Sequence, residues 1–68
     1  MNLLEKLTVE LLEEIERIGH LIRIHKSTPK DDPILAAMMF ARDMAKDAIK
    51  NDDALAIIKF TRELKTYK

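Results

Sequence analysis

The sequence has no cysteine and no tryptophan, one glycine and two prolines among its 68 residues. Without cysteine the chain forms neither disulfides nor thiolate–metal sites, so His20 and His25 are its only soft metal ligands. The scarcity of glycine and proline leaves few turns and favours helices, since Ala, Leu, Glu, Lys and Met are strong helix formers.

Neither sign of charge is in excess, because 12 basic residues balance 12 acidic ones. Binding to nucleic acid or anionic lipid normally shows as a clear basic excess, so the overall charge favours neither. No apolar run reaches the roughly 18 residues that a membrane span needs. The first residues lack the cationic start and apolar stretch of a secretory signal. We therefore expect no membrane association and a cytoplasmic, intracellular location.

Length limits what the chain can bury. We expect one helical domain over residues 1–68, and the core of a domain this small rarely contributes more than about 3–5 kcal/mol. Small domains compensate with disulfides, a metal or self-association. Because the first is excluded and the second is poorly supported, self-association is the compensation that the sequence predicts.

Two polar breaks, at residues 27–33 and 51–53, divide the chain into three segments of helical period. We predict helices over about 3–26, 33–50 and 53–66 and no sheet. The short second break predicts an antiparallel α-hairpin of the last two helices. The expected fold is all-α: a three-helix unit with a long first helix packed on that hairpin, assembling into a dimeric helical bundle.

The first predicted helix carries an apolar stripe wide enough for a bundle. Its central positions are Leu4, Leu11, Ile15, Ile18 and Ile22, and Leu7, Leu12 and Leu21 widen it. Glutamates gather in its first half and basic residues in its second, which suits the helix dipole and permits pairs such as Glu13–Arg17. A later start at Thr8 is the alternative, but we favour one long helix.

Capping residues mark the other two helices. Asp32 is a natural N-cap, Pro33 suits the first helical position, and Asp52 or Asp53 caps the last helix. Asn51 is expected in the left-handed conformation that ends a helix. The predicted apolar line of the second helix is Ile34, Met38, Ala41, Ala45 and Ala48, with Ala37 and Met44 beside it. The predicted inner face of the third is Ala54, Ile57, Ile58, Thr61 and Leu64, flanked by Phe60 and Tyr67.

Several apolar residues lie off these faces, and together they predict a partner-binding patch. They are Leu3, Val9, Ile24, Leu35, Met39 and Phe40. For the Met38–Phe40 run and for Met44 there is an alternative to partner binding: these methionine and phenylalanine side chains fill the core. Gly19 costs a helix about 1 kcal/mol relative to alanine. It either permits close approach of another backbone, within the chain or across a dimer, or is an unselected weak point.

The sequence gives little support for catalysis or metal binding. The five-residue spacing of His20 and His25 places the two imidazoles on separate helical faces. Ser27 is the only serine, and its nearness to His25 in sequence does not make a catalytic triad. One glycine cannot form a phosphate-binding loop. The sequence therefore predicts no catalytic residues, no metal and no cofactor.

A basic stripe along the last helix supports an alternative function. Lys59, Arg62, Lys65 and Lys68 follow one another every three residues, and a hairpin with a basic second helix superficially resembles a helix-turn-helix. It departs from that motif in lacking a turn glycine and side chains that read base edges. The leading expectation is a non-enzymatic adaptor or regulator that binds itself, as a homodimer, and another protein. The alternative is a small DNA-binding regulator.

Overall fold

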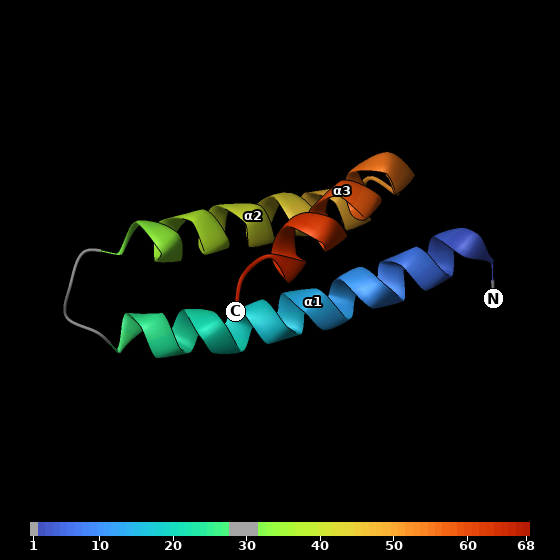
Figure 1. Ribbon diagram of the computed structural model, residues 1–68. Coiled ribbons are helices and arrows are strands. Elements are labelled where there is room, and N and C mark those ends of the chain that lie inside the picture. The colour runs from blue at the N-terminus through green and yellow to red at the C-terminus, as the bar shows by residue number, and fades with distance from the viewer. Residues whose placement is uncertain (1, 28–31) are drawn as a thin grey trace.

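A computed structural model describes residues 2–27 and 32–68, which form three α-helices. Helix α1 spans Leu3–Lys26, α2 spans Pro33–Lys50 and α3 spans Ala54–Lys65. The described residues contain no strand, so the predicted all-α class is confirmed. Figure 1 shows α1 and α2 running in opposite directions, with α3 returning from the far end of α2 toward the middle of the molecule.

Helix α1 is one uninterrupted helix, and the alternative start at Thr8 is wrong. Asn2 is its N-cap: the Asn2 side-chain oxygen accepts from the backbone N–H of Glu5 at 2.8 Å, and the Asn2 amide donates to the Glu5 carboxylate at 3.3 Å. This reciprocal pair satisfies an orphan amide of the first turn and fixes where the helix begins.

The turn between α2 and α3 is compact because one residue serves both helices. Asp53 donates its backbone N–H to Ala48 at 3.0 Å, which closes α2, and its carboxylate accepts from Ala56 N–H at 3.2 Å, which caps α3. The left-handed residue is Asp52, with φ of 50°, whereas Asn51 has φ of −93°. The prediction for Asn51 was wrong by one position, since the left-handed residue of this motif follows the cap.

All three helices contribute to one core. Its buried apolar residues come from each: Leu11, Ile18, Ile22, Met38, Ala41, Ala45, Ala48, Ile57, Phe60 and Leu64. The predicted lines of α1 and α2 supply most of them. On α3 the buried residues are Ile57, Phe60, Thr61 and Leu64, whereas Ala54, at the first position of the helix, is exposed and Ile58 is only half-buried. Phe60, expected on the flank, is buried because α3 contacts both other helices.

Unequal helix length leaves part of the molecule thin. The helices have 24, 18 and 12 residues, so α3 is about 18 Å long against about 36 Å for α1. The molecule measures 43 × 17 × 16 Å. Ile34 lies one turn before Met38 on the predicted buried line, yet it is 52% exposed. Figure 1 shows α3 ending near the middle of α2, so the third helix does not reach that first turn.

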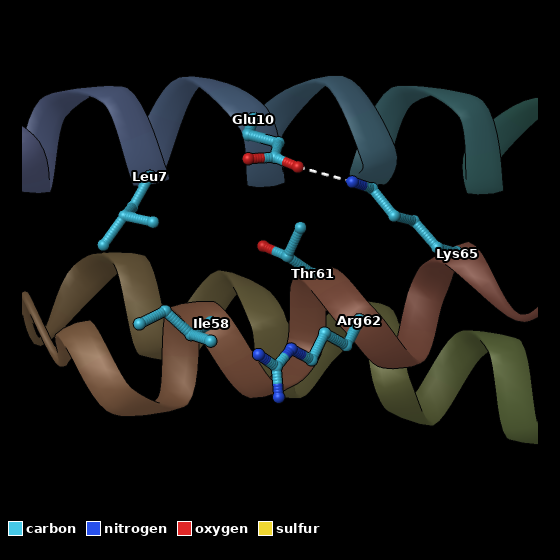
Figure 2. A pocket seen from close by; sticks show the side chains of 6 residues that line it. All are labelled: Leu7, Glu10, Ile58, Thr61, Arg62 and Lys65. Carbon is cyan, nitrogen blue, oxygen red and sulfur yellow. Dashed lines mark hydrogen bonds and ion pairs between the residues drawn. The ribbon is translucent and has the colours of Figure 1, made fainter.

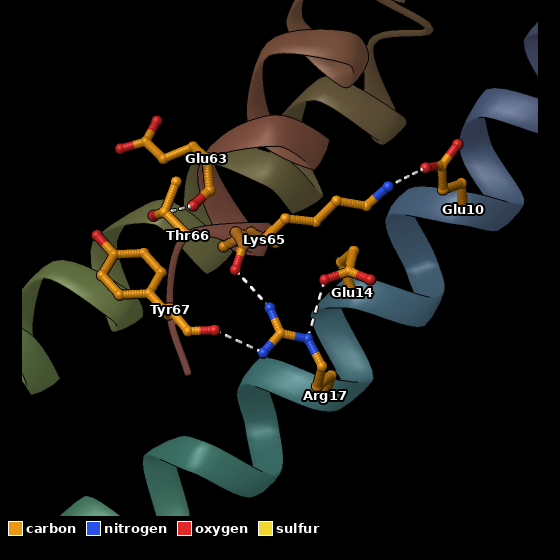
Figure 3. A network of polar contacts seen from close by, with 8 residues as sticks. Glu10, Glu14, Arg17, Glu63, Lys65, Thr66 and Tyr67 are labelled. Carbon is orange, nitrogen blue, oxygen red and sulfur yellow. Dashed lines mark hydrogen bonds and ion pairs between the residues drawn. The ribbon is translucent and has the colours of Figure 1, made fainter.

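A polar network joins α1 to the end of α3 (Figure 3). The guanidinium of Arg17 donates to the carbonyl oxygens of Leu64 and Tyr67, at 2.5 and 2.7 Å, and its Nε donates to the Glu14 carboxylate at 2.9 Å. The last carbonyls of a helix lack the amides that a further turn would supply. Arg17 supplies donors from another helix, and Glu14 rather than the expected Glu13 holds it in place.

A second polar contact joins α1 to the start of α2. His25, in the last turn of α1, meets one carboxylate oxygen of Asp32 through Nδ1. The other oxygen accepts from the backbone N–H groups of Ile34 and Leu35, at 3.0 and 3.2 Å, as the N-cap of α2. The Asp32 cap was predicted and is confirmed. The His25 contact lowers the pKa of the Asp32 carboxyl below its ordinary value near 3.8.

Removing the Arg17 side chain should destabilise the fold. Arg17→Ala leaves the partly buried carbonyls of Leu64 in α3 and of Tyr67 just beyond it without a charged donor, which should lower the free energy of unfolding by about 1–3 kcal/mol. Urea unfolding followed by circular dichroism measures this. Arg62→Ala is the matched control, since Figure 2 shows the Arg62 guanidinium pointing away from α1, and it should change stability by less than about 0.5 kcal/mol. Equal effects of the two substitutions would contradict the network.

Low pH should remove the contribution of the Asp32 carboxylate to the free energy of unfolding. Because its pKa is lower in the folded chain, its stabilising effect is present above pH 3.8 and is lost as the pH falls below that value. Asp32→Asn keeps an N-cap but removes the charge. The stability difference between the parent chain and Asp32→Asn should therefore be present at pH 6 and vanish near pH 2, in thermal unfolding at roughly one-unit steps.

The control is Asp53→Asn, which makes the same exchange at an N-cap where the described contact is a backbone amide rather than an imidazole. Its pH-dependent difference should be smaller. If both substitutions give the same pH profile, the His25–Asp32 contact contributes nothing beyond capping.

Candidate interaction surfaces

The predicted partner residues differ in exposure. Leu3, Val9, Ile24 and Phe40 are exposed, at 72, 43, 62 and 67%. Leu35 and Met39 are half-buried and pack against the core. The exposed four are not one patch: Phe40 is on α2, and Leu3 and Ile24 lie near opposite ends of α1. Val9 and Phe40 each have an exposed apolar neighbour one turn further along the same helix, Leu12 on α1 and Met44 on α2.

Four large apolar residues are exposed where the sequence analysis did not expect it. Leu12 was assigned to the core stripe of α1 but is 50% exposed. It lies on the edge of that stripe, and α2 and α3 do not cover it. Met44 and Ile34 were assigned to α2's buried side, and Leu55, at 81%, lies in the first turn of α3. The broad apolar stripe of α1 gave no signal of where its buried part ends.

Gly19 opens a notch on the outer side of α1. Apart from its two chain neighbours and the backbone of its own helix within four residues, no heavy atom of the described residues lies within 4 Å of a Cβ built at Gly19. The expectation that Gly19 lets another helix of the same chain approach is therefore wrong for the part of the chain that is described. Instead, Gly19 lines a depression of about 290 Å³ with Glu16, His20 and Arg23. Approach across a dimer and a weak point are the two explanations that stand.

A second depression lies at the other end of α1. It has a volume of about 480 Å³ and is lined by Asn2, Leu4, Glu5, Thr8, Val9 and Asp52. Both depressions are open surface features rather than enclosed cavities.

The basic stripe of α3 is partly neutralised. Lys65 donates to the Glu10 carboxylate of α1 at 2.5 Å, and this contact raises the pKa of Lys65. Figure 2 shows the pair bridging the two helices beside a small depression of about 180 Å³ that Leu7, Ile58, Thr61 and Arg62 also line. The Lys59 ammonium lies 5.4 Å from the ring centre of Phe60. Arg62 and Lys68 are exposed. Because Lys65 and Lys59 already contact other side chains of the chain, the four residues do not form one free cationic row.

Residues 2–27 and 32–68 contain neither a clustered metal site nor a membrane-spanning helix. No three His, Asp or Glu side chains there gather as a metal site. His20 is exposed, and His25 is held by Asp32. None of the helices in those ranges has the length and hydropathy needed to cross a bilayer.

Comparisons with protein families, curated proteins and solved structures found no match. The class that the fold defines is a small all-α protein of three helices. Its function must therefore be argued from the surfaces described above.

Gly19 should be replaceable without steric conflict in the single chain. Gly19→Ala removes backbone freedom from the unfolded state and adds a Cβ in open space, so it should stabilise the monomer by about 0.5–1 kcal/mol. Urea unfolding at a concentration low enough to exclude self-association measures this. A loss of stability under those conditions would mean that Gly19 is packed within the chain after all.

Proposed function

We propose that this protein is a non-enzymatic helical interaction module that works as a homo-oligomer in the cytoplasm, most simply as a dimer, and also binds another protein as an adaptor or regulator. The observation that carries the proposal is its surplus of exposed apolar side chains. Eight large ones are at least 38% exposed beside a core of ten apolar residues, three of them alanines. The eight are Leu3, Val9, Leu12, Ile24, Ile34, Phe40, Met44 and Leu55.

The surface area supports the same proposal. The accessible surface is 4939 Å², against about 4,400 Å² expected for a compact monomer of 7.9 kDa. An elongated chain with a thin core gains more from covering apolar surface than a chain that already buries it. In the proposed assembly, the long first helix packs on an antiparallel hairpin of α2 and α3, and copies join into a larger helical bundle.

Two surfaces divide the proposed roles. The outer side of α1 holds two neighbouring exposed apolar residues, Val9 and Leu12, and supports self-association. Phe40 lies on the side of α2 away from its buried line and is 67% exposed. It remains available to a second protein when α1 is covered.

Solution mass tests self-association. Light scattering from about 10 μM to about 1 mM, in low and high salt, spans the affinities expected for a small interface. The proposal predicts a dimer or larger species that persists in high salt, because apolar burial is not screened. A Val9→Ser/Leu12→Ser variant should be shifted toward monomer, whereas the control Leu55→Ser should not. A parent chain that is monomeric throughout this range would contradict the proposal.

DNA binding by α3 is the competing function, and salt separates the two. Binding to phosphates weakens steeply as salt rises. Under the proposal, duplex DNA should bind no more tightly to the parent chain than to a Lys59→Gln/Arg62→Gln/Lys68→Gln variant, which leaves the Glu10–Lys65 pair intact. Salt-sensitive binding that this variant loses would favour the DNA-binding alternative.

A further inference from the structure

The outer side of α1 carries a second stripe that the core does not use. Residues spaced alternately by four and three positions share one helical face. From the N-terminal end the stripe is Glu5, Val9, Leu12, Glu16, Gly19 and Arg23. All are exposed except Gly19, which is half-buried. Roughly a third of a turn separates this stripe from the buried line through Leu11 and Ile18.

This stripe is symmetric in position and opposite in charge at its two ends. Its members pair across a midpoint at residue 14: Glu5 with Arg23, Val9 with Gly19, and Leu12 with Glu16. The whole helix follows the same polarity. Five glutamates and one lysine precede Arg17, whereas the remainder, from Arg17 to Lys26, has two arginines and one lysine and no acid.

Antiparallel contact between two copies would place each of these positions opposite its pair. A twofold axis at residue 14 makes the same patch meet itself in reverse, as closed dimers require. A parallel contact would place Glu5 beside Glu5 and Arg23 beside Arg23, which is repulsive. Charge therefore selects both the occupant, a second copy of this chain, and its direction.

The shapes of the side chains inside the stripe favour the same antiparallel pairing as the charges at its ends. Beyond the neighbouring residues and backbone of α1 itself, the notch at Gly19 has no heavy atom of the described residues within 4 Å of a Cβ position, and Val9 is 43% exposed at the paired position. A valine that enters a glycine notch lets two helix backbones come close. Leu12 meets the methylene groups of Glu16, whose carboxylate stays in water. A glycine that weakens α1 by about 1 kcal/mol thereby has a role that its own chain does not give it.

We infer that the chain pairs with itself through this outer stripe of α1, antiparallel, with Glu5 of each copy facing Arg23 of the other. The inference rests on the proposed function, since it names the self-association surface. Figure 1 shows why α1 is suited to it: α2 and α3 cover only one side of the longest helix, and its other side forms a long edge of the molecule.

Charge reversal tests the pairing. Glu5→Arg and Arg23→Glu should each raise the dimer dissociation constant about tenfold, because two equivalent contacts per dimer change from attraction to repulsion. The Glu5→Arg/Arg23→Glu double variant restores opposite charges in both contacts and should recover most of the parent affinity. A mixture of the two single variants should form the heterodimer in preference to either homodimer.

Matched controls carry the same charge changes away from the stripe. Glu63→Arg and Arg62→Glu on α3 should leave the dissociation constant within about twofold of the parent. Figure 3 shows the Glu63 carboxylate pointing away from the Arg17 network. Circular dichroism of each variant confirms that it is folded, since Glu5 also takes part in the N-cap of α1.

Disulfide cross-linking tests whether the two α1 helices pair antiparallel, without changing the charge of the stripe. Because the chain has no cysteine, Val9→Cys and Gly19→Cys introduce single thiols. An oxidised mixture of the two should yield mainly the mixed disulfide. Like-with-like disulfides, or charge reversals no stronger than the α3 controls in a chain that still associates, would overturn this interface and leave the proposed function standing. A monomeric parent chain would overturn both.

Discussion

The short third helix is the constraint on which the rest of this structure depends. With 12 residues against 24 in α1, it can complete a three-helix core over only part of the molecule. Where it is present, Phe60, Thr61 and Leu64 are buried against the other helices. Beyond it, the first turn of α2 leaves Ile34 half exposed. Arg17 stands where α3 ends, and its two hydrogen bonds to the last carbonyls fix that end against α1.

A thin core of this kind makes the outer surface matter for stability as well as for binding. Alanine supplies three of the ten buried apolar residues among those described, all on α2, and these three positions bury little area each. The exposed stripe of α1, a third of a turn from its buried line, combines apolar residues, a glycine notch and opposite charges at its ends. Self-association at that surface would add burial that three unequal helices cannot provide alone.

Much of the fold could be predicted because the signals are local. Helix ends are marked by Pro33 directly after Asp32 and by the polar break at 51–53. These residues act through capping, which depends only on neighbours in the sequence. The seven-residue repeat of Leu4, Leu11 and Ile18 likewise fixes a buried face. The left-handed residue was predicted at Asn51 but is its neighbour Asp52, since both residue types tolerate that conformation.

The surface was harder to predict because exposure depends on what the neighbouring helices reach. Leu12 and Ile34 fit the period of a buried face, and only the extent of α2 and α3 shows that they are uncovered. The Arg17 contacts join residues 47 and 50 positions apart in the chain, and His25 meets Asp32 across a loop. No periodicity encodes such pairs. Gly19 stands out in the sequence as the single glycine, but only its surroundings in the fold show that no other helix of the described chain packs against it.

The central claim is that the chain recognises itself through the outer side of α1. Amide resonances of the isotopically labelled protein, recorded by NMR over a dilution series, test this most directly. The account predicts that the amide chemical shifts of Val9, Leu12 and Gly19 change with protein concentration, whereas those of Phe40 and Leu55 stay constant. Shifts confined to Phe40 or Leu55, or none at any residue between about 10 μM and about 1 mM, would contradict it.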